Sequence, residues 1–243
     1  MKEAIDTQII ELQRFLEAHP ETEFVDVLLP DLCNIVRGKR VGRKHLEKLY
    51  DQGILIPSST FLLDVNGVGT NAGGRGFSDG DPDVTVRPAA GSLAPVSWAG
   101  PGAAQVLGIL YELDGEPCPV DPRHVLRRVV SRLADDGLYP VVALELEFYL
   151  LDSALADAGE AHPPVLPDTG RPADRTQVYS LADLDGVSSF LAEMESVCAA
   201  QRVPLGGASS EYAAGQFEIN LEHVGDPIAA ADHAILLQRA VKG

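Results

Sequence analysis

The sequence predicts an α+β protein of two domains, residues 1–117 and residues 118–243. Three observations lead to this class. A helix-like apolar period opens the chain, and a pair of strand-like segments typical of a β-hairpin follows it. In the second half, strand-like segments rich in glutamate alternate with segments that begin as helices do. With 45% hydrophobic residues, the chain has enough apolar side chains for a sizeable core.

The first domain is expected to begin with an amphipathic helix that ends before Pro20. The apolar residues at helical spacing are Ile5, Ile9, Leu12 and Leu16. Residues 24–29 and 35–41 then read as the two strands of a hairpin, because turn-forming residues separate them. A short helix over 43–52 is expected to end at Gly53.

Residues 66–101 are rich in Gly, Pro, Asp and Ser, which predicts a long loop region with few regular elements. Long ordered loops in compact domains are often functional, and a flexible surface excursion is the alternative. Residues 105–113 read as a further strand, closed by the turn at Asp114-Gly115.

Asp121-Pro122 supplies an N-cap and a proline at the first helical position, which predicts a helix to about residue 136. Its expected inner face holds Val125, Val129 and Leu133. The elements expected after it are a strand over 140–151, a loop or lid over 152–176, a helix over 184–201, a strand over 216–223 and a helix over 228–242.

The charge of the chain narrows the classes of partner. Asp and Glu outnumber Lys and Arg by 36 to 19, so the formal net charge is −17. Such a chain is poorly suited to phosphate backbones or anionic membranes, and metal ions or cationic partners suit it better. No apolar run reaches the length of a membrane span, and the N-terminus does not resemble a signal peptide. Three distant cysteines suggest no disulfide framework, so a cytoplasmic location is expected.

Four glutamates in otherwise core-like segments are the candidate functional residues. Glu145 and Glu147 are two residues apart in a predicted strand, so their side chains share one face. Glu218 lies in the last predicted strand, and Glu211 joins it if the chain turns back at Gly215. Like charges side by side either raise a pKa or recruit a cation, and oxygen ligands favour magnesium, calcium or manganese.

Two other interpretations use the same residues. A strand with alternating glutamates is also typical of an ordinary antiparallel sheet with one solvated face. Two carboxylates could also act as acid and nucleophile or base in glycoside hydrolysis. That reaction needs a sugar cleft lined with aromatic residues, and aromatic residues make up only 6% of this chain, with one tryptophan.

The order of several motifs resembles the glutamine synthetase family. The catalytic-domain motifs are E-L-E-F-Y-L at 145–150, E-Y-A-A-G-Q-F-E-I-N-L at 211–221 and the segment that begins D-P-I-A-A-A-D-H at 226–233. Upstream, R-G-K-R at 37–40, V-R-P at 86–88 and Y-E-L-D-G-E-P at 111–117 are similar to its N-terminal domain. The resemblance implies a β-grasp domain followed by the N-terminal half of a catalytic domain, truncated here, with a curved antiparallel sheet flanked by helices.

The resemblance also implies a chemistry. Members of the family use ATP to phosphorylate a carboxylate, usually that of glutamate, and an amine then displaces the phosphate. By this resemblance, Glu145, Glu147, Glu211 and Glu218 are ligands of Mg²⁺ or Mn²⁺, and ATP is the co-substrate. Asn220, Gly215 and Gln216 are then candidate substrate-binding residues. A homo-oligomer is expected if the full catalytic domain is present, without nucleic acid or membrane partners.

Three departures from the family pattern shape the expectation. Ala214 stands where the family usually has proline. Residues 56–59 read Ile-Pro-Ser-Ser and lack the aspartate that glutamine-forming members place before two serines. This suggests a polyamine or another primary amine as acceptor rather than ammonia. The later family motifs would lie beyond Gly243, so the alternative is a catalytically incomplete fragment that acts as a metal-binding or assembly module.

Overall fold

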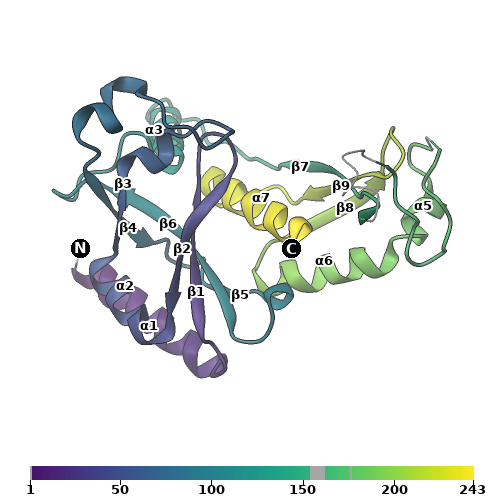
Figure 1. The fold of residues 1–243 in the computed structure, drawn as a ribbon, viewed down its shortest axis with the longest axis horizontal. Coiled ribbons are helices and arrows are strands. Elements are labelled where there is room, and N and C mark those ends of the chain that lie inside the picture. The colour runs from purple at the N-terminus through teal and green to yellow at the C-terminus, as the bar shows by residue number, and fades with distance from the viewer. Residues whose placement is uncertain (1, 154–161, 176) are drawn as a thin grey trace. The chain divides into compact units, whose positions relative to one another are not determined.

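The computed structural model describes residues 2–153, 162–175 and 177–243, and the chain divides into two compact units, Met1–Tyr139 and Pro140–Gly243 (Figure 1). Both units combine helices with a sheet, so the predicted α+β class is confirmed. The domain boundary expected after residue 117 stays a prediction. None of the helices in the described ranges combines the length and apolar character that a bilayer crossing requires.

The first unit is built on a six-stranded mixed sheet with the strand order β2-β1-β6-β4-β3, and β5 also pairs with β6. β1 and β6 are parallel, and the other paired neighbours are antiparallel. The strands are β1 (Phe24–Pro30), β2 (Val36–Gly42), β3 (Ile54–Pro57), β4 (Asp83–Pro88), β5 (Ala94–Pro95) and β6 (Ala103–Tyr111). The predicted hairpin is therefore confirmed as β1 and β2.

Two helices of the first unit, α1 (Lys2–Ala18) and α2 (Leu46–Gln52), lie against each other and close the core over the sheet (Figure 1). Leu12 of α1 and Tyr50 of α2 are almost fully buried among strand residues such as Val25 and Val86. The helix α2 ends at Gly53, whose φ of 77° favours glycine, as the sequence predicted.

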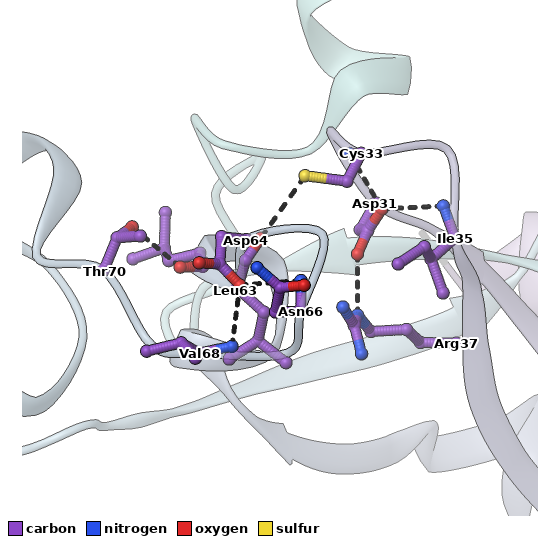
Figure 2. A network of polar contacts seen from close by, with 10 residues as sticks. Asp31, Cys33, Ile35, Arg37, Leu63, Asp64, Asn66, Val68 and Thr70 are labelled. Atoms are coloured by element: carbon purple, nitrogen blue, oxygen red, sulfur yellow. Dashed lines mark hydrogen bonds and ion pairs between the residues drawn. The ribbon is translucent and has the colours of Figure 1, made fainter.

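The turn between β1 and β2 is held by the carboxylate of Asp31, whose side chain is fully buried. Asp31 accepts hydrogen bonds from the backbone N–H groups of Cys33 and Ile35 and forms an ion pair with Arg37 at 2.7 Å. Figure 2 shows this network and the contact from Cys33 Sγ to the carbonyl of Leu63, at 3.6 Å. The turn is thereby fastened to the loop that follows β3.

The expectation of few regular elements between residues 66 and 101 was wrong in one important place. β4 lies inside this range and pairs with both β3 and β6, with Val84 and Val86 fully buried. Gly and Asp residues on its N-terminal side mask the short Val-Thr-Val alternation in a composition window. The long-range pairing with β6, rather than the local sequence, makes this segment a strand.

Helix α3 (Pro122–Asp135) begins where the sequence predicted. The carboxylate of Asp121 caps it by accepting from the N–H of Arg123, and its second oxygen accepts from the N–H of Leu110 in β6. The predicted inner face was wrong, because Val125 and Val129 are 42% and 48% exposed within this chain, whereas His124 is buried. His124 bonds through Nε2 to the carbonyl of Leu110, which turns this side of the helix inward.

The second unit contains a three-stranded antiparallel sheet in the order β7-β9-β8. Its strands are β7 (Glu145–Tyr149), β8 (Leu205–Ser210) and β9 (Gln216–Leu221). The helices among its described residues are α5 (Leu181–Asp185), α6 (Ser188–Ala200) and α7 (Pro227–Lys242). Strand β8 was not predicted, because Leu-Gly-Gly-Ala-Ser-Ser reads as a turn. The helix expected over 184–201 is two helices, separated around Gly186.

One face of this small sheet forms an apolar core with α6. Phe217 and Val187 are buried there, and the rings of Phe148 and Phe190 lie 5.7 Å apart between centroids. The predicted strand over 140–151 is shorter than expected, with Val142 making only an isolated bridge to Val224. Part of the predicted loop or lid over 152–176 lies outside the described residues, and within 162–175 an isolated bridge joins Val165 to Pro172.

Candidate metal and substrate site

The opposite face of the three-stranded sheet carries the candidate site. Along β7, Glu145 and Glu147 alternate with the less exposed Leu146 and Phe148, so the two carboxylates project on the same side, as predicted. Along β9, the buried Phe217 and Ile219 leave Glu218 on the other face. The sequence pattern therefore decides which face is acidic.

The pairing of the strands decides which residues meet on that face. Glu147 stands directly opposite Glu218, and Glu145 stands opposite Asn220. Ser209 of β8 faces Glu218 from the other side. Directly opposed residues in antiparallel strands have Cβ atoms roughly 5 Å apart. Glu147, Glu218 and Ser209 consequently form one row across the sheet.

Glu211 follows β8 and is brought to this face by the turn that leads into β9. The N–H of Glu211 donates to the carbonyl of Gln216 at 2.8 Å, which closes the turn. The side chain of Glu211 accepts a hydrogen bond from Ser209 Oγ at 2.9 Å. Gly215 has a φ of 74°, and a Cβ there would lie 2.9 Å from the carbonyl oxygen of Leu150. The turn therefore needs glycine at this position, as the sequence suggested.

The charges of the other three glutamates affect the pKa of Glu218. Burial raises the pKa of Glu218 above its ordinary value, and the charges of Glu145, Glu211 and Glu147 raise it further. A hydrogen bond from Asn220 opposes this rise. Burial and the three nearby carboxylates therefore both favour the protonated form of Glu218, and the same excess of negative charge would stabilise a bound cation.

The side chains are not gathered into a metal cage in this conformation. Across residues 2–153, 162–175 and 177–243, no group of three or more His, Cys, Asp or Glu side chains lies close enough to hold a metal ion. Glu147 instead accepts from Gln216 Nε2, and Glu211 accepts from Ser209. Their positions on neighbouring strands still fit a hard divalent cation, because rotation of the long glutamate side chains can turn the carboxylates toward a common point.

Asn220 and Gln216, two of the predicted substrate-binding residues, differ in their surroundings. Asn220 Oδ1 is buried without a hydrogen-bond partner among the described residues, so an acceptor remains for a ligand. The side chain of Gln216 is engaged at both ends by protein atoms. Sequence reasoning missed Ser209, because nothing in its local sequence signals a strand.

Comparison with known proteins shows the family of this chain. A model of the glutamine synthetase catalytic domain matches residues 119–243, slightly more than half of the chain. The chain belongs to the glutamine synthetase family. The family resemblance inferred from the order of the sequence motifs is therefore confirmed.

The relatives of this glutamine synthetase family member include two γ-glutamylamine synthetases and a glutamine synthetase by name. Gamma-glutamylputrescine synthetase of Escherichia coli K12 is 40% identical over 96% of this chain and 49% of its own length. Gamma-glutamylpolyamine synthetase of Streptomyces coelicolor is 33% identical over 87% of this chain and 43% of its own length. Glutamine synthetase of Methanosarcina mazei is 23% identical over 91% and 45%. The chain spans about half the length of the curated relatives it matches.

Solved structures support the fold of this family member. A complex of GmaS with ADP superposes with a TM-score of 0.73 at 23% identity, covering 94% of this chain and 47% of the other. A glutamine synthase homologue superposes with a TM-score of 0.71 at 25% identity, covering 90% and 48%.

The raised pKa of Glu218 gives a testable pH dependence of stability in this family member. Since the folded state holds this proton more tightly than the unfolded state, the associated stabilisation is present below the ordinary pKa of 4.5. It is lost as the pH rises through the higher folded-state pKa. Glu218→Gln removes the repulsion, so with a chelator present we expect the variant to be more stable at pH 7 by about 0.5 kcal/mol.

Thermal unfolding of both proteins between pH 4 and pH 8 measures this difference. Glu222→Gln, at an exposed position just after β9, is the matched control. A Glu218→Gln variant that is no more stable than wild type at pH 7 would contradict the expected repulsion.

Proposed function

We propose that this protein is an ATP-dependent carboxylate–amine ligase that forms a γ-glutamyl amide, with a polyamine or another primary amine as acceptor. The observation that carries the proposal is the row of carboxylates on one sheet face, with Glu147 opposite Glu218 and Glu211 held at the adjoining turn. The names of the relatives from E. coli and S. coelicolor support an amine larger than ammonia.

We infer further that residues 1–117 are the β-grasp domain of such a ligase and residues 118–243 the N-terminal half of its catalytic domain. Support comes from the mixed sheet covered by α1 and α2 in the first unit, and from the start of the family match at residue 119. In this interpretation, residues 118–243 supply the acidic face.

Glu145, Glu147, Glu211 and Glu218 would hold Mg²⁺ or Mn²⁺, and the ions would neutralise charge on ATP and on the phosphoryl group in transfer. The protein supplies the positions of the donors. Neighbouring strands place three of the carboxylates side by side, and the turn at Gly215 adds the fourth. The free Oδ1 of Asn220 could accept a hydrogen bond from a substrate N–H on the same face.

The chemistry expected from this arrangement has two steps. The γ-carboxylate of glutamate attacks the terminal phosphorus of ATP, which gives an acyl phosphate and ADP. The neutral amine then attacks the acyl carbon, phosphate leaves, and the amine loses a proton. The carboxylates of the acidic face attract the protonated amine, and the general negative charge of the chain adds to that attraction. The amine gives up one proton before it attacks, and the second proton leaves as the amide forms.

A second candidate function is a metal-binding or assembly module without catalysis of its own. It is favoured by one observation, namely the row of carboxylates on the sheet face, because a divalent-cation site needs these oxygen donors and neither a nucleotide nor an amine. This alternative predicts saturable binding of a divalent ion without turnover.

The test is product formation by the full 243-residue chain with ATP, Mg²⁺, glutamate and putrescine, followed by mass spectrometry. Hydroxylamine in place of the amine should trap the acyl phosphate as glutamyl hydroxamate. Glu147→Gln is expected to lower either rate by about 100-fold, as loss of a group that stabilises transition-state charge does. Glu47→Gln on the exposed surface of α2 should leave it unchanged.

The outcomes separate the candidates. Product with ammonium but not with putrescine would refute the proposed acceptor while keeping the ligase. Metal binding without product or hydroxamate would favour the module.

A further inference from the structure

Gln216 occupies a central place in the acidic face. It is the first residue of β9, stands opposite Tyr149 of β7 and lies two residues before Glu218. It directly follows Gly215, whose carbonyl accepts from the N–H of Leu150 at 2.9 Å. Gln216 thus sits where the turn after β8 meets the edge strand β7.

The side-chain amide of Gln216 is used at both ends. Its Nε2 donates to Glu147 Oε2 at 2.5 Å, and its Oε1 accepts from the N–H of Ala213 at 3.0 Å. Because a backbone N–H can only donate, the oxygen end must face Ala213. The nitrogen end is thereby directed at the Glu147 carboxylate, and the orientation of the amide is fixed by the chain itself.

The backbone of Gln216 holds the same turn. Its carbonyl accepts from the N–H of Glu211 at 2.8 Å, and its own N–H donates to the carbonyl of Ala213 at 3.0 Å. One residue therefore connects the carboxylate of Glu147 on β7 to the backbone on which Glu211 stands. These two glutamates come from segments more than 60 residues apart in the sequence.

From these contacts we propose that Gln216 is a positioning residue that sets the place of the Glu147 carboxylate relative to the turn carrying Glu211. The inference rests on the proposed function in taking both glutamates as metal ligands. Gln216 would affect metal binding through these two glutamates, since both ends of its own side chain are hydrogen-bonded to protein atoms.

Glutamine suits this position for a physical reason. A donor is needed toward Glu147 and an acceptor toward Ala213, and a neutral amide provides both without adding charge beside four glutamates. The bond uses Oε2 of Glu147, so Oε1 is left for a cation. Residues that orient a metal ligand commonly contribute 10- to 100-fold to metal affinity.

The test uses the full chain and two readouts. For Mn²⁺ binding measured by electron paramagnetic resonance, we expect Gln216→Met to weaken affinity by about 10- to 100-fold. Gln52→Met, the same change at an exposed site in α2, should leave the affinity unchanged. An affinity of Gln216→Met within twofold of wild type would overturn the proposal.

The second readout needs no metal. In ¹H–¹⁵N NMR spectra, Glu147→Ala should shift the backbone amides of Glu211 and Ala213, because Gln216 links them to Glu147. The same replacement in a Gln216→Met background should no longer shift them, and a shift that persists would overturn the proposal. If Gln216→Met does not fold, the spectrum of Glu147→Ala is used by itself. Backbone amides of Glu211 and Ala213 that do not shift in that variant would overturn the proposal.

The two readouts also separate this inference from the proposed function. A wild-type chain that binds no Mn²⁺ would count against the metal site and hence the proposed ligase. The NMR comparison would then decide by itself whether Gln216 couples Glu147 to the turn.

Discussion

Replacing both Glu145 and Glu147 by alanine is expected to reduce the affinity of the chain for Mg²⁺ or Mn²⁺ by at least about 100-fold. Replacing a residue that only orients a metal ligand already costs up to about 100-fold in affinity, and here the ligands themselves are removed. Both side chains lie on the acidic face, opposite Asn220 and Glu218. Removing them takes away half of the candidate carboxylate ligands. Isothermal titration calorimetry of the purified proteins measures the effect directly.

A matched control is available in the same unit. Glu193 and Glu195 in α6 are also two residues apart and are exposed, so their double replacement by alanine changes the net charge equally. Affinity retained in the control and lost in the Glu145/Glu147 variant would support a specific site. Equal losses in both would instead indicate a diffuse effect of net charge, and no binding by the folded wild type would contradict the metal site itself.

Phe217→Ala is expected to destabilise the chain by about 3–5 kcal/mol, the usual range for removing a buried aromatic side chain. Phe217 is 2% exposed and packs with Leu166, Ala173 and Val187. Its ring centroid lies 6.4 Å from that of Phe148, so β7 and β9 lose a shared apolar contact. The small unit has few other buried aromatic rings to compensate within its described residues.

Urea unfolding followed by circular dichroism gives the change in free energy. Phe77→Ala removes a ring that is 69% exposed and should change stability by no more than about 0.5 kcal/mol. Because Phe217 lies between Gln216 and Glu218, we also expect weaker metal binding in Phe217→Ala. A loss of stability below 1 kcal/mol would show that the core under the acidic face does not depend on this ring.

Local sequence was sufficient for several parts of the fold. The Asp121-Pro122 pair correctly marked the start of α3, because an N-cap and a fixed φ act within one turn. The last helix, α7, begins at Pro227, one residue before the predicted start. The prediction failed for β4 and β8, whose sequences are short or rich in small residues. Those strands form because strands distant in the sequence pair with them, and a local sequence pattern does not indicate such pairing.

The candidate site was also predictable from the sequence only in part. The sequence by itself determined that Glu145 and Glu147 share a face and that Gly215 turns the chain, because both follow from the geometry of one short segment. Only the tertiary structure decided that Glu147 stands opposite Glu218 and that Gln216 bonds to it. Strand register depends on the pairing of β7 with a segment about 70 residues away, so the meeting of these side chains is a property of the folded sheet.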